Sequence, residues 1–247
     1  MEFKRTWTDD YLIHSYESDK STRATPIALL QFMQESAWNH AEHLQLGFTH
    51  LSQKGLAWIL ARLSLKITQL PRWHKKIILE TWPSGLERLF AYRDFRISSE
   101  DKKELAIGST SWITIDVERR RPQKTDTYLN LQTSDAERVF PQFTGKIPAI
   151  SDIDSVSHRK VYFSYLDVNG HVNNVKYLEF VIDSLPFDFL NDHHLELLEI
   201  NFLAEALYDD IIEIKTQRTS DLSFVHSIQR QHEGDELCRL KTSWVKV

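Results

Sequence analysis

The 247-residue sequence has few of the residues that build disulfides, tight turns or membrane spans, with 1 cysteine, 7 glycines and 7 prolines. A lone Cys238 cannot form a disulfide within the chain and excludes a metal site built on several cysteines. No stretch approaches the roughly 18 consecutive apolar residues of a membrane-spanning helix. The opening residues, MEFKRTWTDDYL, carry charges but lack the apolar segment of a secretion signal. These absences favour a reduced, cytoplasmic protein.

An excess of positive charge is also missing. Lysine and arginine total 30 against 35 aspartates and glutamates, which gives a formal net charge of −5. This balance provides no general attraction to nucleic acid or to an anionic membrane, so an acidic partner would need a local basic patch. Hydrophobic residues make up 41% of the chain and aromatic residues 11%, which is enough for a large packed core. The length suits two small units better than one.

Two pairs of short segments repeat within the chain. STSWITI (109–115) resembles KTSWVKV (241–247), and LQFMQES (30–36) resembles LEFVIDS (178–184). The offsets are 132 and 148 residues, and the two matches occur in the same order in each half. A pair of ordered matches in the same structural context indicates an internal duplication.

Each half is predicted to contain one long helix. In the first half Thr25 is a suitable N-cap, Pro26 suits the first helical position, and apolar residues recur at three- and four-residue spacing until Gly47. In the second half the same spacing begins at Val175 and ends before Pro186. The stripe on the first helix is wide, which predicts burial on several sides.

Strand-like segments surround each predicted helix, one before it and four after it. They are 4–16, 58–70, 75–83, 88–98 and 105–116 in the first half, and 158–166, 194–205, 211–218, 223–231 and 237–247 in the second. One helix followed by a meander of strands, twice, predicts the α+β class and a tandem hotdog fold, in which an antiparallel sheet wraps a long central helix. We expect an N-terminal hotdog at 1–128, a connection at 129–151 and a C-terminal hotdog at 152–247.

The segment DVNGHVNN (167–174) gathers polar groups directly before the second helix. A helix start has unpaired backbone N–H groups and the positive end of the helix dipole, which together favour a negative oxygen. Gly170 would let the backbone approach a substrate carbonyl closely. The pattern therefore predicts an oxyanion site beside Asp167, Asn169 and His171. Taken one at a time, these residues are equally typical of a turn or a surface cap.

The sequence resembles the acyl-acyl-carrier-protein thioesterases of plants and bacteria, which release fatty acids from carrier protein. The similarity spans nearly the whole chain and is most specific in YLDVNGHVNNVKYLEF, where Asp-x-Asn-x-His-Val-Asn-Asn-x-x-Tyr matches the family's active-site segment. Without a plastid transit segment before Met1, the chain looks like a bacterial member. The resemblance implies a thioester hydrolase that uses neither a metal nor a redox cofactor and accepts acyl chains from acyl carrier protein.

In that family the segment supplies an aspartate, an asparagine and a histidine, which fall here on Asp167, Asn169 and His171. A glutamate follows downstream on a strand, just before a position that is commonly cysteine. The matching stretch INFLAEALYDD puts this carboxylate at Glu205 and has Ala206 in place of the cysteine. The resemblance therefore implies a catalytic set without a cysteine nucleophile.

The remaining cysteine, Cys238, lies on a different predicted strand, so we expect attack by activated water or directly by a carboxylate. Glu205 is the favoured general base. Asp167 would orient Asn169 and stays open as an alternative base. Asn169 would position the water or donate to the thioester oxygen, and His171 would donate to the carbonyl or protonate the leaving thiolate.

The first half has Asp19, Ser21 and Arg23 at the positions that correspond to the catalytic segment, at an offset of 148. It is therefore expected to lack a complete catalytic set, and the resemblance implies that it shapes the pocket for the acyl chain instead. Ordinary core packing is the alternative for each candidate pocket residue. The candidates on the first helix are Leu29, Met33, Ala37 and Trp38.

Two basic clusters stand out against the negative net charge. They are Arg119, Arg120, Arg121 and Lys124 in ERRRPQK, and Arg72, Lys75 and Lys76 in PRWHKK. Each is either a solvated face or a dock for an acidic carrier protein and its phosphopantetheine phosphate, because arginine suits phosphate. No recognition helix or basic surplus accompanies them, which argues against nucleic acid.

Two other functional interpretations stay open at this point. An acyl-coenzyme A thioesterase would use the same fold, because both substrates share the phosphopantetheine arm. A non-catalytic acyl-binding sensor could also use a duplicated hotdog, although it would not need the four polar residues together. HAEH (40–43) spaces two histidines by three but lacks convincing carboxylate partners, so we interpret it as packing and not as a zinc site. A homodimer is possible.

Overall fold

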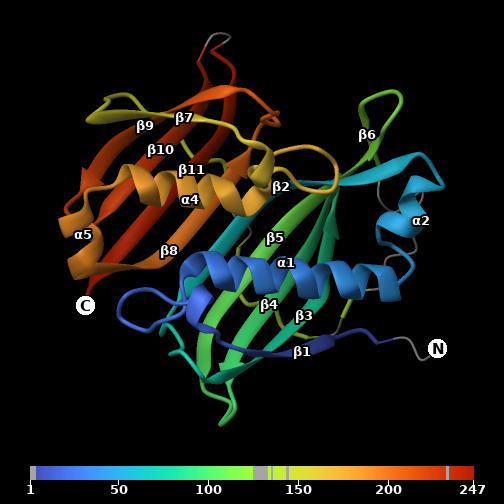
Figure 1. The fold of residues 1–247 in the computed structure, drawn as a ribbon. Helices are drawn as coiled ribbons and strands as arrows, with labels where there is room; N and C mark the ends of the chain where they lie inside the picture. Colours follow the sequence, from blue (N-terminus) through green and yellow to red (C-terminus); the bar gives the residue numbers. More distant parts are fainter. Residues whose placement is uncertain (1–3, 125–132, 135, 143–144, 232–233) are drawn as a thin grey trace. The chain divides into compact units, whose positions relative to one another are not determined.

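The computed structural model divides the chain into two compact units, Met1–Phe143 and Thr144–Val247 (Figure 1). The residues it describes are 4–124, 133–134, 136–142, 145–231 and 234–247. No helix in this described part of the chain is long and apolar enough to cross a membrane.

The first unit is an antiparallel sheet with one long helix. The strands follow the order β1-β3-β4-β5-β2, and β6 pairs with β5. Their bounds are β1 (Trp7–Leu12), β2 (Leu56–Ile67), β3 (Lys76–Glu87), β4 (Phe90–Ser99), β5 (Glu104–Asp116) and β6 (Arg121–Gln123). Helix α1 (Pro26–His43) lies across one face of this sheet, and a short α2 (Phe48–Ser52) follows it (Figure 1).

The start of α1 agrees with the sequence prediction, but its end does not. Thr25 caps the helix by accepting the Ala28 N–H on its side-chain oxygen at 3.1 Å. The helix ends at His43 because Gln45 adopts a left-handed φ of 58° and the N–H of Leu46 then bonds the carbonyl of Ala41 at 2.9 Å. This is a Schellman ending with glutamine in the position where glycine is usual. Gly47, predicted to end the helix, begins α2 instead.

The second unit repeats the arrangement of the first. Its strands follow the order β8-β11-β10-β9-β7 and are all antiparallel to their neighbours. Their bounds are β7 (Ser155–Lys160), β8 (His193–Phe202), β9 (Ile211–Ser220), β10 (Ser223–Arg230) and β11 (Glu236–Lys246). The central helix is α4 (Asn174–Ser184), and a short helix α5 (Phe187–Asp192) that the sequence reading did not predict follows Pro186. The tandem hotdog prediction is confirmed.

The expected connection at 129–151 lies partly outside the described residues. Within its described part, the N–H of Val139 donates to the Oδ2 of Asp94 in the first unit at 3.0 Å. The N–H of Ile147 donates to the Oδ1 of Asn201 in the second unit at 2.8 Å. Each end of the connection is therefore held by a buried polar side chain of its own unit.

Candidate active site

The polar segment before α4 is a tight loop whose two ends are joined by backbone hydrogen bonds. The N–H of Asp167 donates to the carbonyl of His171 at 2.7 Å, and the N–H of Gly170 donates to the carbonyl of Asp167 at 3.0 Å. The Oδ1 of Asp167 accepts the N–H groups of Asn169 at 2.8 Å and of His171 at 3.2 Å. Gly170 has a left-handed φ of 79°, which glycine adopts without strain. One carboxylate oxygen thus holds the loop from within.

The loop leads directly into the helix start. Asn173 is the N-cap of α4, and its Oδ1 accepts the N–H of Val175 at 3.0 Å. Its own N–H donates to the carbonyl of Tyr165 at 2.9 Å. His171 therefore lies two residues before the cap, next to the positive end of the helix dipole.

His171 and Glu205 meet across two loops. The Nδ1 of His171 lies 3.3 Å from the Oε1 of Glu205, and the two side chains are 34% and 50% exposed. This exposure leaves room for a substrate to reach both groups. Glu205 was predicted at the end of a strand, but β8 stops at Phe202 because the N–H groups of Leu203 and Ala204 both bond the carbonyl of Leu237. Glu205 therefore lies in the loop beyond the strand.

The backbone around Glu205 is held on three sides. The Nη2 of Arg230 donates to the carbonyl of Glu205 at 3.0 Å. The hydroxyl of Tyr177 accepts the N–H of Ala206 at 3.1 Å, and the carbonyl of Ala206 accepts the N–H of Val172 at 3.0 Å. Burial raises the pKa of Tyr177 well above its ordinary value, so its hydroxyl stays neutral. The position of Glu205 is thus set by Tyr177 and Arg230, whose parts in the site the sequence did not reveal.

The remaining members of the predicted set are placed differently. Asn169 is exposed, and its side-chain amide forms no hydrogen bond with the residues that the structure describes. No atom lies within 4 Å of the position that a Cβ would take at Gly170. Both residues are therefore open to solvent, and they precede His171 directly in the chain.

The thiol of Cys238 is unsuited to nucleophilic chemistry. It lies on β11 and is fully buried. Burial, with a smaller contribution from the charge of Glu236, raises its pKa, which keeps the thiol protonated and unreactive. Ala206, at the position where the family resemblance expects a cysteine, is also fully buried.

The first unit contains a copy of the loop that holds the site. The Oδ1 of Asp19 accepts the N–H groups of Ser21 at 2.7 Å and of Arg23 at 3.0 Å. The N–H of Asp19 donates to the carbonyl of Arg23 at 2.7 Å. Thr22, at the position of Gly170, also has a left-handed φ, here 60°. The loop frame is thus repeated with a serine and an arginine in place of Asn169 and His171.

The loop that contains Glu205 and Ala206 also has a counterpart in the first unit. The N–H of Ala24 donates to the carbonyl of Pro71 at 2.8 Å, as that of Val172 does to Ala206 in the second unit. Leu70, which is buried, therefore occupies the position of Glu205. Of the four polar residues of the second unit, the first unit has only the aspartate.

Among the candidate pocket residues, three are buried and one is not. Leu29, Met33 and Ala37 lie on the buried face of α1. Trp38 is 41% exposed and stacks on Phe48, with ring centroids 5.9 Å apart. The wide apolar stripe of α1 therefore reaches the surface at Trp38, where the ring of Phe48 on α2 stacks against it.

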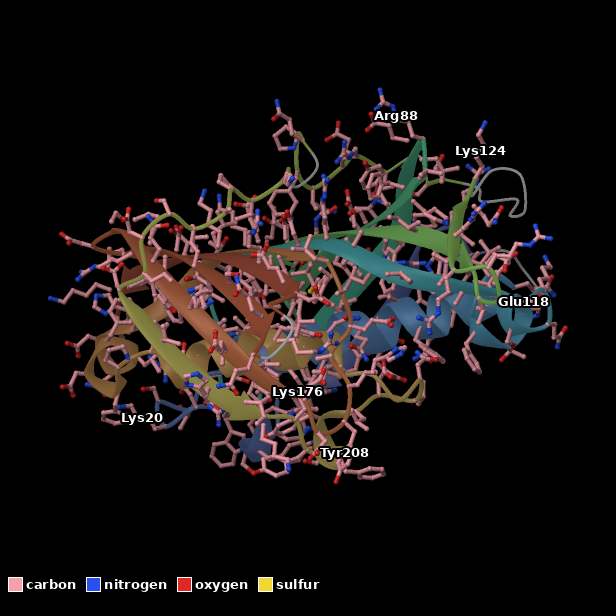
Figure 2. All side chains as sticks on the ribbon, turned by 90° about the horizontal axis from the view of Figure 1, so that it is seen from above. Lys20, Arg88, Glu118, Lys124, Lys176 and Tyr208 are labelled. Atoms are coloured by element: carbon pink, nitrogen blue, oxygen red, sulfur yellow. The ribbon has the colours of Figure 1, made fainter. Side chains whose placement is uncertain are left out.

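The two basic clusters lie on exposed turns. Arg119 and Arg120 lie on the turn between β5 and β6, Arg121 is the first residue of β6, and Lys124 follows that strand. Glu118 and Lys124 are labelled in Figure 2. Arg72 and Lys75 lie on the exposed loop that leads into β3, and Lys76 is the exposed first residue of that strand. Neither cluster is part of the His171–Glu205 pair.

The structure also bears on the histidine pair in HAEH. His40 is fully buried, its Nδ1 lies 2.9 Å from the Nη1 of Arg93, and its Nε2 lies 2.9 Å from the carbonyl of Lys4. Because a guanidinium only donates, Nδ1 is the acceptor and Nε2 carries the proton. Both ring nitrogens are engaged, and no group of three or more metal-ligating side chains occurs among the described residues.

Comparisons with known proteins match both units. Residues 4–129 match the family model for the acyl-ACP thioesterase N-terminal domain, and residues 150–246 match that for the C-terminal domain. Oleoyl-acyl carrier protein thioesterase 1 of Arabidopsis thaliana, a chloroplastic protein, is 26% identical over 276 residues, which cover 98% of this chain and 76% of that protein.

Solved structures show the same fold. An acyl-ACP thioesterase from Bacteroides thetaiotaomicron aligns with a TM-score of 0.88 at 22% identity and covers 98% of both chains. The 12:0-ACP thioesterase from Umbellularia californica aligns with a TM-score of 0.84 at 21% identity, covering 99% of this chain and 98% of that one. The similarity therefore includes both hotdog units.

Proposed function

The chain belongs to the acyl-ACP thioesterase family and is a thioester hydrolase, and from this premise we propose that it hydrolyses fatty acyl-ACP with water activated by Glu205. The observation that carries the proposal is the 3.3 Å contact between Glu205 and His171 beside the start of α4. A carboxylate next to an imidazole, both reachable from solvent, supplies a proton acceptor and a proton donor in one place.

The reaction then follows from the groups present. Glu205 takes a proton from water while the water oxygen attacks the thioester carbonyl. The resulting oxyanion lies near the helix start, where the side-chain amide of Asn169 can donate to it; one such donor is typically worth about 3 kcal/mol. The thiolate leaves with the C–S bonding pair and takes up the proton that Glu205 removed from water, either directly or relayed through His171. Because an ordinary thiol has a pKa of about 8.5, its thiolate is a tolerable leaving group without strong help from an acid.

The roles of the two carboxylates can be separated by the internal repeat. Asp167 uses one oxygen to accept two backbone N–H groups, and Asp19 makes the same pair of bonds in a unit that has leucine in place of Glu205. This supports a loop-holding role for Asp167 and the base role for Glu205. Direct attack by the second oxygen of Asp167 is the alternative.

We propose that the buried face of α1 binds the acyl chain, with Leu29, Met33 and Ala37 as the contact residues. A Cβ built at Gly108 would lie 2.4 Å from the Cε of Met33, so the methionine side chain fills the space that the missing Cβ leaves over β5. A flexible thioether is suited to adjust to different ligands. Exposed Trp38 lies outside this buried set.

Product release from purified protein tests the function. Incubation with fatty acyl-ACP should yield free fatty acid and carrier thiol in equal amounts, and acyl-coenzyme A should be a poorer substrate by kcat/KM. A panel of acyl lengths on both carriers would also identify the preferred chain. Binding of acyl-ACP without any product would instead favour the acyl-binding sensor, and faster hydrolysis of the coenzyme A series would favour the acyl-CoA thioesterase.

A further inference from the structure

The loop of the first unit that corresponds to the Glu205 loop has the opposite charge. After Pro71 the first unit continues Arg-Trp-His-Lys, whereas after Ala206 the second unit continues Leu-Tyr-Asp-Asp. The loops share their backbone frame, because the N–H of His74 bonds the carbonyl of Ile13 at 2.9 Å and that of Asp209 bonds the carbonyl of Val161 at 3.2 Å. His74 and Asp209 also share a left-handed φ, 64° and 73°. The two loops therefore share a backbone frame but carry side chains of opposite charge.

The basic side chains come from two segments that are held together. The Nη1 of Arg72 donates to the carbonyl of Ser21 and to the Oγ1 of Thr22, both at 3.4 Å, and the N–H of Trp73 donates to the carbonyl of Thr22 at 2.8 Å. Arg23 and Arg72 face each other in a β-bridge. We call the resulting surface the basic loop surface. It comprises Lys20, Arg23, Arg72, Lys75 and Lys76 around Trp73; Lys20 is labelled in Figure 2.

The charge of this surface is only partly offset. Asp19 lies 3.6 Å from the Nε of Arg23, and this ion pair uses one of the five cations. Arg72, Lys75 and Lys76 are exposed and make no ion pair with any residue in the described part of the chain. Trp73 is 48% exposed between them. An exposed indole and three cations that form no ion pair with the described residues thus occur together on a chain whose net charge is −5.

We propose that the basic loop surface is the docking site for the acidic carrier protein that delivers the thioester, an inference that rests on the proposed function. Clustered cations attract an acidic partner and speed its association, and they lose this effect as salt rises. Arginine pairs well with carboxylate and phosphate oxygens, and an aromatic side chain at the centre of a polar patch is a typical binding anchor. Among the residues that the structure describes, the β5–β6 hairpin cluster, predicted from the sequence, has no exposed aromatic residue between its basic side chains.

Charge reversal at two lysines tests the docking site. The double variant Lys75→Glu/Lys76→Glu changes exposed side chains that make no hydrogen bond or ion pair with the described residues, so folding should be kept. We expect its KM for fatty acyl-ACP to rise by about tenfold or more, with kcat at saturation and kcat/KM for acyl-coenzyme A changed by less than about twofold. The salt dependence of kcat/KM for acyl-ACP should also weaken.

The hairpin provides a matched control. The double variant Arg119→Glu/Arg121→Glu reverses two exposed charges on the same unit. It should change neither the KM for acyl-ACP nor the kcat/KM for acyl-coenzyme A by more than about twofold. Trp73→Ala should raise KM for acyl-ACP alone. Equal effects on both substrates, no effect on acyl-ACP, or a larger effect from the hairpin variant would each overturn the docking site. Wild-type activity on acyl-ACP is measured first, so a failure of the proposed function is recognised separately.

Discussion

Asp19 and Asp167 make the same contacts in the two units, each accepting the backbone N–H groups of the residues two and four positions further along. A contact present in both units cannot depend on the chemistry of one of them. The aspartate is therefore part of the inherited loop frame, and the proposed reactive groups Asn169, His171 and Glu205 are replaced by other residues in the first unit.

This pair gives the first prediction. Replacing either aspartate by alanine removes the acceptor of two backbone N–H groups and should lower the free energy of unfolding by about 1–2 kcal/mol. Only Asp167→Ala should also reduce kcat, because it loosens the loop that carries His171. Denaturant unfolding and acyl-ACP turnover of the two variants measure this, and equal loss of kcat in both would contradict it.

The contact between Tyr177 and Ala206 supports a second prediction. Tyr177→Phe leaves the N–H of Ala206 without its acceptor in a buried position, at a cost of about 1–3 kcal/mol. Because Glu205 precedes Ala206, kcat should fall by about tenfold with little change in KM. Tyr162→Phe, at an exposed tyrosine, is the control. A Tyr177→Phe variant with wild-type kcat would show that the hydroxyl does not position Glu205.

Each unit contains a fully buried histidine, and both histidines predict that the folded protein becomes less stable in acid. Burial, with the nearby charge of Arg93, lowers the pKa of His40 to about 4, and burial lowers that of His226 to about 3. The ordinary value is 6.5, so between pH 6.5 and 4 the unfolded chain binds protons that the folded chain does not. Stability should therefore be complete above pH 6.5 and should fall as the pH drops toward 4.

The size of this effect is measurable. Near pH 5 each histidine should account for about 2 kcal/mol of lost stability relative to neutral pH. His40→Gln keeps an oxygen that can accept from Arg93 and should remove its share of the loss. Denaturant unfolding at several pH values tests this. An unchanged difference between pH 7.5 and pH 5 in that variant would rule out His40 as a source.

The packing of Met33 over Gly108 predicts that these two residues influence which acyl-chain length the enzyme prefers. Met33→Ala should open space on the buried face of α1 and shift kcat/KM toward longer acyl chains by roughly two methylene groups. Gly108→Ala should favour shorter chains, because its Cβ displaces the end of Met33. Val181→Ala changes the corresponding position of α4 and should lower stability without altering the chain-length profile. An unchanged profile for Met33→Ala would remove α1 from the acyl pocket.

Local rules were sufficient for much of the fold. The cap at Thr25 and the stop at Pro186 are set by neighbours in the chain, and the repeated Thr-Ser-Trp segments occupy equivalent strands, β5 and β11. The end of α1 could not be predicted in this way, because Gln45 adopts a backbone conformation that its side chain does not favour. Short α5 is likewise a single turn and a half with no periodic pattern long enough to detect.

The candidate site shows a similar division. The family resemblance marked His171 and Glu205, and the structure brings them together. Arg230 belongs to no motif, and the motif that ends in Tyr177 does not indicate what its hydroxyl does, so only the folded arrangement reveals that both residues hold the backbone around Glu205. The repeat offset pairs the Asp19 loop with the Asp167 loop from the sequence alone, whereas the match between residues 70–75 and 205–210 is hidden because the two segments share no residue.

The most direct measurement of the central claim is the turnover of Glu205→Gln on fatty acyl-ACP beside that of Asp167→Asn. Both substitutions keep the shape of the side chain and remove its ability to take a proton. We expect Glu205→Gln to lower kcat by about a hundredfold or more, while Asp167→Asn, whose amide oxygen can still hold the loop, loses much less. Near-normal turnover by Glu205→Gln, with Asp167→Asn inactive, would contradict the account and identify Asp167 as the reacting carboxylate.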